Sequence, residues 1–316
     1  MYSKFDMRDA FITALYELAK RDSNIIILSN DFGAPALDRF RNDLPKQFIN
    51  AAISEQNIIS TAAGLAKGGK KVVVYSIATF ITLRALEQIK IDLCVMNLPV
   101  TILSVGTGYA YSTDGPTHHA TEDIAVMRAM SGMKIYSPSD ANMSAALVET
   151  ITNLSGPQYI RLDRGKYPIK HAIGNSIKNG FSVWNESSKP KIAIISTGGM
   201  FHRALAVSDV LSADGVDSLA IDLYQLKPLQ PEVLGQVLKK CKAVVTLEEH
   251  TQNGGVGSIV AELIADENLM LPLKRVAIKD EQLYAYGARE NLHLDRGLDV
   301  GSAVDGVKDF LQKINC

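Results

Sequence analysis

Two adjacent histidines follow a turn-forming triplet in segment 114–119, which reads Asp-Gly-Pro-Thr-His-His. Histidine is the side chain whose unperturbed pKa lies nearest neutral pH, so a firmly held imidazole can transfer protons or polarise an oxygen atom. Asp-Gly-Pro is typical of a tight turn, which would fix the direction of the imidazoles that follow. A plain loop with solvent-facing histidines is the alternative, and the surrounding sequence has to decide between the two.

Three further segments carry residues suited to a binding site. Glu55 and Gln56 precede the small-residue run 60–66, which predicts a helix packed closely on a strand. The apolar run 72–80 predicts a buried strand that ends near Phe80. Segment 247–258 contains Leu-Glu-Glu-His and then Gly-Gly-Val-Gly-Ser. These glycines lack the spacing and the downstream acid of a dinucleotide-binding loop, so a tight turn between a strand and a helix is the better interpretation.

In this order the motifs resemble those of the transketolase family, thiamine-diphosphate enzymes that move two-carbon ketol units. They resemble 1-deoxyxylulose-5-phosphate synthase nearly as well. The resemblance covers almost the whole chain, and four motifs in sequence are far more specific than any one of them. It implies a transketolase-type transferase that uses thiamine diphosphate and moves a ketol unit from a ketose, or ketose phosphate, to an aldose.

The resemblance also implies a cofactor site. Glu55 matches the family's acid that hydrogen-bonds to the pyrimidine ring of the cofactor, and Phe80 matches the aromatic residue on which that ring stacks. Gln56 and Tyr75 complete the expected cofactor-binding residues. A buried carboxylic acid shares its proton with the ring instead of with water, which is what activation of the cofactor requires. The alternatives are a glutamate favoured at a helix start and an ordinary core aromatic.

On the substrate side, His118 matches the family's catalytic histidine that contacts substrate hydroxyls, and Asp114 is its hydroxyl-binding neighbour. His119 stands where the family usually has Gln, and extends the polar lining. Arg161 and Arg164 match arginines that grip a phosphate, Arg164 being the closer match; a surface salt bridge is the alternative for either. A phosphate-binding histidine of the family is replaced here by Gly106, so the identity of the donor and acceptor sugars stays open.

Half of the expected enzyme is missing from the chain. The family binds the diphosphate through a divalent metal held by Gly-Asp-Gly and an Asn pair, and no Gly-Asp-Gly occurs in the sequence. The nearest match is Ala-Asp-Gly at 213–215, with no Asn pair after it. Magnesium or calcium needs several oxygen ligands, so we predict no metal-binding residues here. We expect an N-terminal partner subunit that carries the diphosphate and metal site, in an α2β2 assembly.

Three alternatives to a split transketolase remain. A 1-deoxyxylulose-5-phosphate synthase is normally one long chain. The β-type subunit of a 2-oxoacid dehydrogenase is split in this way but generally lacks the loop at 114–119. A non-catalytic assembly or regulatory subunit would not need Glu55, Phe80, Asp114 and His118 together.

The elements that position these residues alternate between apolar strands and amphipathic helices. This pattern predicts an α/β fold of two doubly wound domains, with mainly parallel sheets and ligands bound beyond the carboxyl ends of the strands. We expect a pyrimidine-binding domain over 1–168, a linker over 169–189 and a smaller transketolase C-terminal-like domain over 190–316. Strands are expected at 24–29, 72–76, 100–105, 133–138, 158–162, 191–196, 218–222 and 243–248, and helices at 8–21, 83–97 and 141–153.

Bulk composition narrows the function classes. The 316 residues include 33 basic and 34 acidic ones, which are interleaved, so no patch suited to nucleic acid or an anionic membrane is expected. No apolar run approaches the roughly 20 residues that span a bilayer. Cys94, Cys241 and Cys316 are too few and too far apart for a disulfide framework. A reducing cytoplasm is the expected location.

Overall fold

The computed structural model describes residues 2–172, 179–187 and 189–315. The chain forms two compact units: Met1–Thr107 with Val126–Ile177, and Gly108–Ala125 with Lys178–Cys316. Residues 173–178 and 188 of the expected linker, and Cys316, lie outside the described residues. Segment 108–125, which contains the two adjacent histidines, therefore packs with the C-terminal part of the chain.

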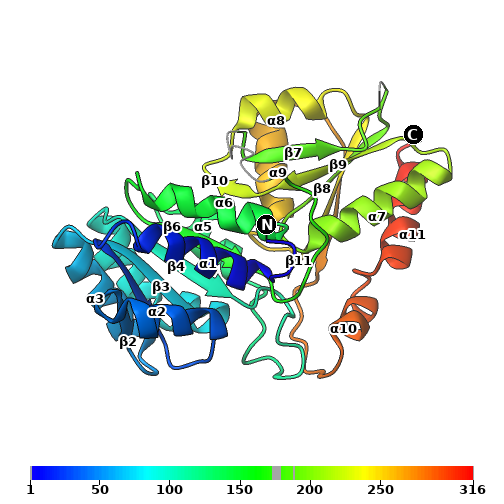
Figure 1. Cartoon of the computed structure of the whole chain (residues 1–316). Helices are drawn as coiled ribbons and strands as arrows, with labels where there is room; N and C mark the ends of the chain where they lie inside the picture. The colour runs from blue at the N-terminus through cyan, green and yellow to red at the C-terminus, as the bar shows by residue number, and fades with distance from the viewer. Residues whose placement is uncertain (1, 173–178, 188, 316) are drawn as a thin grey trace. The chain divides into compact units, whose positions relative to one another are not determined.

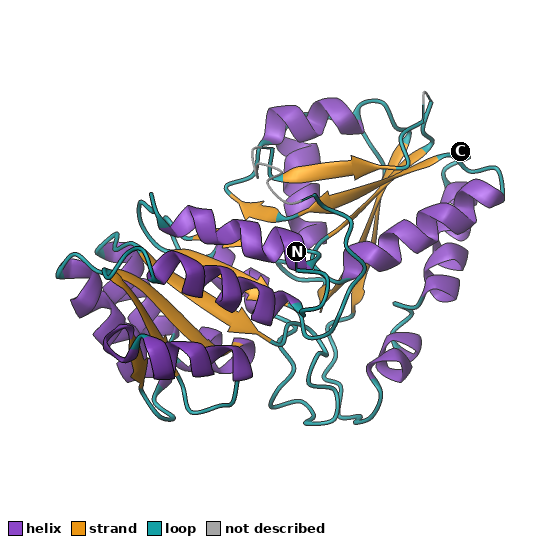
Figure 2. Cartoon of the chain, viewed as in Figure 1, coloured by secondary structure: helices purple, strands orange, loops and turns teal. Residues whose placement is uncertain are grey.

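The first unit is built on a parallel sheet in which β5, β6, β4, β3, β1 and β2 lie side by side in that order. Figure 1 labels four of these strands, β2, β3, β4 and β6, and Figure 2 shows the strands of the unit in orange among its helices. Each paired strand runs parallel to its neighbour. Their bounds are β1 Ile25–Ser29, β2 Phe48–Asn50, β3 Lys71–Ile77, β4 Val100–Val105, β5 Lys134–Tyr136 and β6 Gln158–Leu162. All their carboxyl ends consequently meet at one edge of the sheet, which is the edge where such folds bind ligands.

Helices cover this sheet on both faces. One face packs on α1 and the segment after α6, through a core that includes Phe11, Leu15, Ile27, Tyr75 and Leu103. Alternate strand residues such as Ile26, Val74 and Ile102 are buried too, so the opposite face is also covered, since side chains alternate across a strand. The helices are α1 Met7–Ala19, α2 Asp38–Asp43, α3 Glu55–Lys67, α4 Leu86–Gln88, α5 Asp123–Arg128 and α6 Ala141–Ala146.

The second unit has its own sheet, ordered β12, β11, β8, β9, β7, with β7 antiparallel to β9 and the other pairs parallel. Helices α7 and α11 pack on it through one apolar core, and Figure 1 shows α8 and α9 on the other side. The strands of this sheet are β7 Phe181–Trp184, β8 Ile192–Ser196, β9 Ser218–Leu223, β11 Ala243–Thr251 and β12 Leu273–Ile278, and the short strand β10 Gln225–Lys227 lies outside it. The helices are α7 Met200–Ala213, α8 Pro231–Leu238, α9 Val256–Asp266, α10 Arg289–Asp295 and α11 Val300–Lys313.

The predicted fold class, two α/β domains with mainly parallel sheets, is confirmed. The expected helix at 83–97 differs in detail, because it consists of π-helical turns at Phe80–Arg84 and Ile89–Val95 around α4. The Thr82 hydroxyl donates to the Ala78 carbonyl at 2.7 Å, and such side-chain bonds compete with the regular helical ladder. Among the described residues, no helix is long and apolar enough to cross a bilayer.

Candidate functional site

Glu55 and Phe80 meet at one place in the first unit, although 25 positions separate them. Glu55 is the first residue of α3, follows β2 closely, and is 4% exposed. Arg84 donates from Nη1 to Glu55 Oε2 at 2.6 Å, and its guanidinium carbon lies 4.8 Å from the centre of the Phe80 ring. A planar donor thus contacts both a buried carboxylate and an aromatic side chain. Arg84 is half-exposed, so its guanidinium has room to move toward solvent, but the buried Glu55 carboxylate then needs another hydrogen-bond partner.

The other two predicted cofactor residues lie in different surroundings. Gln56 is exposed on the first turn of α3, next to Glu55. Tyr75 on β3 is fully buried, and its ring stacks on Phe32 with the ring centres 4.6 Å apart. Tyr75 therefore supports the strand end from within the core, and its contact with a cofactor stays a prediction.

The two predicted phosphate-binding arginines also differ in position. Arg161 is buried within β6, where its Nη1 donates to the Ser137 hydroxyl at 3.2 Å. Arg164 is exposed two residues beyond the end of β6, and its backbone N–H donates to Asp163 at 2.6 Å. Gly106 follows β4 with φ of +90°, a backbone conformation that favours glycine over the family's histidine. Arg164 is thus the arginine that a solvated anion can reach.

In the second unit, segment 108–120 forms a loop closed at its base. Gly108 and Ala120 exchange two backbone hydrogen bonds of 2.9 Å. Inside the loop, the His118 N–H donates to the Gly115 carbonyl at 2.9 Å, and the His118 Nδ1 lies 3.0 Å from the Thr117 hydroxyl. Asp114 is exposed and His118 is partly exposed. The predicted turn is therefore present, and it presents both residues at the surface of the unit.

A buried ionic cluster lies against the base of this loop. The Glu249 carboxylate, near the end of β11, accepts hydrogen bonds from Nε and Nη2 of Arg289 and from Nε2 of His293. Burial by itself would raise the pKa of Glu249, but Arg289 and His293 more than offset that effect and lower it to about 2. A Cβ atom on Gly108 would overlap the Glu249 carboxylate. The Glu249 carboxylate therefore stays ionised at neutral pH, and it is in contact with the loop.

His119 points into the second unit and not to its surface. It is 5% exposed, and its ring meets Tyr109 edge-on with the ring centres 4.9 Å apart. Its Nε2 has no hydrogen-bond partner among the described residues. Burial lowers the pKa of His119, because it disfavours the imidazolium, and the nearby Glu249 charge opposes this only in part. The neutral imidazole is thus the form at neutral pH, and substrate contact by His119 stays a prediction.

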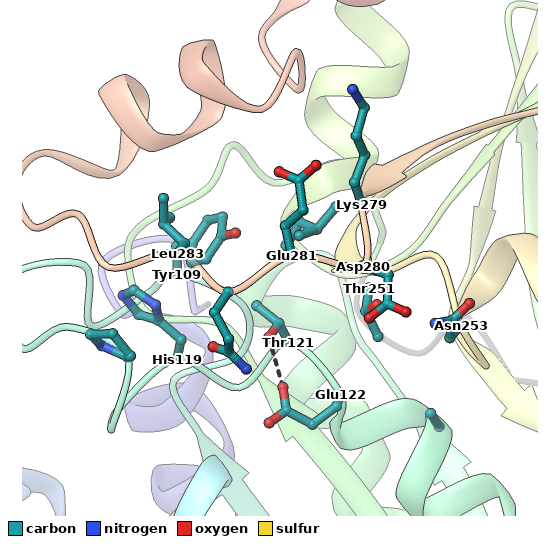
Figure 3. Close-up of a pocket in the computed structure, with 14 residues that line it drawn as sticks. Tyr109, His119, Thr121, Glu122, Thr251, Asn253, Lys279, Asp280, Glu281 and Leu283 are labelled. Carbon is teal, nitrogen blue, oxygen red and sulfur yellow. Dashed lines mark hydrogen bonds between the residues drawn. The ribbon is translucent and has the colours of Figure 1, made fainter.

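A cavity of about 530 Å³ lies beside His119 and Tyr109, within the second unit (Figure 3). Its wall is mainly polar, and the Thr121 hydroxyl donates to Glu122 at 2.7 Å within it. The residues that line it come from the loop that ends at Ala125 and from the stretches after β11 and β12: Tyr109, Pro116, His119, Thr121, Glu122, Ala125, Thr251, Asn253 and 278–283. Among the residues that the structure describes, no three His, Cys, Asp or Glu side chains are grouped so as to hold a metal ion.

Sequence reasoning missed Arg84 and the partners of Glu249. Arg84 follows Phe80 by one turn, but nothing in the sequence links it to Glu55, which is 29 positions away. Glu249 belongs to the Leu-Glu-Glu-His motif, so its importance was visible, whereas Arg289 and His293 are 40 and 44 positions away. Only the fold brings these charges together.

Comparison with known proteins identifies both domains. Residues 3–170 match the family model for the transketolase pyrimidine-binding domain, and residues 183–301 match that for the transketolase C-terminal domain. The chain therefore belongs to the transketolase family and contains these two domains, as the sequence motifs predicted.

Several relatives are similar to this chain over most of their own length. An apulose-4-phosphate transketolase subunit from Phocaeicola vulgatus is 31% identical, with 97% of each chain covered. The corresponding apulose-4-phosphate transketolase subunit from Actinobacillus succinogenes is 34% identical over 84% of this chain and 85% of its own length. A solved structure described as a split gene transketolase, inactive β4 tetramer, is 32% identical, with a TM-score of 0.85 over 97% of this chain and 98% of that one. The chain is thus similar over most of its length to single subunits of transketolases and to a split gene transketolase.

Proposed function

We propose that the chain is the C-terminal subunit of a two-chain, thiamine-diphosphate-dependent transketolase. It transfers a two-carbon ketol unit from a ketose phosphate to an aldose, and it works only with an N-terminal partner subunit. The observation that carries the proposal is the meeting of Glu55, Arg84 and Phe80. A buried carboxylate that accepts a hydrogen bond from a planar group beside an aromatic ring is the arrangement that an aminopyrimidine ring requires.

The residues of the chain fit the pyrimidine end of the cofactor in three respects. Glu55 is shielded from water, so a proton on its carboxyl group is shared with a ring nitrogen and not with solvent. Phe80 is only partly buried, which leaves part of its ring to support the pyrimidine. Arg84 is half-exposed and can vacate the position. When bound, thiamine diphosphate supplies the acidic ring carbon that takes up the two-carbon unit.

On the substrate side, Arg164 holds the phosphate, because its exposed side chain lies at the carboxyl edge of the first sheet. His118 contacts the hydroxyl groups beside the bond that breaks and takes up or returns the hydroxyl proton. Asp114 accepts a hydrogen bond from a neighbouring hydroxyl. The names of the Phocaeicola and Actinobacillus relatives include a phosphorylated sugar, which supports a phosphorylated donor.

The partner subunit supplies the diphosphate and metal site, since the sequence has no Gly-Asp-Gly segment. Similarity to proteins named as single subunits of a transketolase, and to a split gene transketolase, supports this division. An α2β2 assembly in the cytoplasm is the form we infer.

The decisive test is a ketol-transfer assay on the chain alone, on its partner alone and on their mixture. Each sample contains thiamine diphosphate, Mg²⁺, an aldose phosphate acceptor and one member of a panel of phosphorylated and unphosphorylated ketoses. We expect turnover only in the mixture and preferentially with phosphorylated donors. Turnover by the chain alone, or a mixture that assembles but transfers nothing from any ketose, would refute the proposal.

A further inference from the structure

The loop that carries His118 belongs to the second unit, and several contacts hold the base of this loop. The loop ends are held by the paired hydrogen bonds of Gly108 and Ala120 and by the Thr251 N–H, which donates to the Thr121 carbonyl at 2.7 Å. The Glu249 carboxylate packs directly on Gly108. The base of the loop is therefore attached to β11, the strand on which Glu249 and Thr251 lie.

We propose that Glu249, Arg289 and His293 are positioning residues, which fix the base of loop 108–120 and thereby the place of His118. This inference rests on the proposed role of His118 at the substrate. It assigns to the C-terminal domain a part in catalysis, although none of the three residues touches the substrate.

Geometry explains how the cluster can act on the loop. Arg289 contacts Glu249 through two nitrogens, so the forked contact fixes the orientation of the carboxylate as well as its position. His293 holds the same carboxylate, and its ring lies 6.4 Å from that of Tyr109, the second residue of the loop. Tyr109 in turn packs edge-on against His119, the neighbour of His118. The carboxylate, the two rings and the backbone bridge thus form one continuous contact from β11 to the catalytic segment.

Burial strengthens these contacts. Glu249, His293, Tyr109 and His119 are each at most 6% exposed. Charge-assisted hydrogen bonds are strengthened where water is excluded. A loop fixed in this way spends little time away from its catalytic geometry, and a misplacement of about 1 Å can cost about 100-fold in rate.

The test uses Glu249→Gln, which keeps the size of the side chain and removes its charge. Glu281→Gln is the matched control, because Glu281 also pairs with an arginine of this unit, Arg296 at 2.9 Å, but is 59% exposed. Hydrogen exchange of the backbone amides, followed by mass spectrometry on the full chain, reports the loop directly. We expect peptides covering 108–120 to exchange at least about 10-fold faster in Glu249→Gln, with α7 still protected and the control unchanged.

A second pair of variants covers the case in which Glu249→Gln does not fold. His293→Gln keeps a donor for Glu249 and should preserve loop protection, whereas His293→Leu removes the donor and should lose it. In the enzyme reconstituted with its partner subunit, we expect Glu249→Gln and His293→Leu to lower kcat by about 10- to 100-fold with KM nearly unchanged.

Each outcome has one meaning. Unchanged exchange in the loop, or loss of protection throughout the second unit, would overturn the positioning role. If the loop exchanges faster but kcat is unchanged, the cluster does hold the loop, but His118 has no part in the proposed active site.

Discussion

Gly115, in the turn before His118, is the position where a single methyl group tests the loop geometry most sharply. Its φ is +76°, a conformation that L-residues adopt only with strain. A Cβ atom there would lie within 3.0 Å of three carbons of the Tyr286 ring. Gly115→Ala therefore adds two penalties, one from the backbone and one from the contact with Tyr286.

The two penalties can be separated with a matched glycine. Gly215 has φ of +79°, and a Cβ atom there would meet nothing within 4 Å. Gly215→Ala should therefore cost about 1 to 2 kcal/mol from backbone strain alone. Gly115→Ala should cost about 2 to 4 kcal/mol, because overlap with the Tyr286 ring adds about 1 to 2 kcal/mol. This is the lower part of the usual range for overpacking, since Tyr286 is 67% exposed and its ring can move away.

Denaturant unfolding of the two variants, and of Gly115→Ala combined with Tyr286→Ala, measures these terms. Removing the ring should restore Gly115→Ala to the level of Gly215→Ala, which gives a coupling energy of about 1 to 2 kcal/mol. Turnover should fall in Gly115→Ala and recover in part in the double variant, because the turn carries His118. Equal stability of Gly115→Ala and Gly215→Ala, or no rescue by Tyr286→Ala, would show that the turn and Tyr286 are not packed as described.

Three further perturbations test separate parts of the account. In the reconstituted enzyme, Arg164→Ala should raise KM for phosphorylated donors with little loss of kcat, and His118→Ala should do the reverse; unaltered constants for phosphorylated donors in Arg164→Ala would remove the phosphate contact. Glu248 accepts from the first two N–H groups of α9 at 2.6 and 2.7 Å, so Glu248→Ala should cost about 1 to 2 kcal/mol in denaturant unfolding. Burial tends to raise the pKa of Asp140, but hydrogen bonds from the His171 side chain and three backbone N–H groups outweigh it and lower the pKa. Its stabilising effect is therefore complete above the unfolded pKa of about 3.9 and is lost as pH falls through the lower folded value. Asp140→Asn should abolish that acid-dependent loss, and an unchanged pH profile of unfolding would contradict it.

Much of the fold could be predicted because each strand carries its own signal. Runs such as Ile25–Ser29 and Val100–Val105 are apolar throughout, as strands buried on both faces must be. Strand β12 was missed because Lys274 and Arg275 interrupt its apolar pattern. The sequence gives no sign that segment 108–125 groups with the second unit, since its contacts are with residues more than 100 positions away.

The site could be predicted only as far as short motifs extend. Glu55, Phe80 and the turn at 114–119 are recognisable locally, and the structure brings the first two together. The cluster around Glu249 combines side chains from β11 and α10, and no local pattern joins them. Tyr75 and His119 stay predicted site residues, and their burial could not be predicted because it depends on neighbours that the sequence does not reveal.

The central claim is that this chain holds only the pyrimidine half of a cofactor site, which a partner subunit completes. Isothermal titration of thiamine diphosphate with Mg²⁺ tests it most directly, into the chain alone and into the chain mixed with its N-terminal partner. We predict tight, magnesium-dependent binding in the mixture and no such binding by the chain alone. Equally tight, magnesium-dependent binding by the chain alone would contradict the claim.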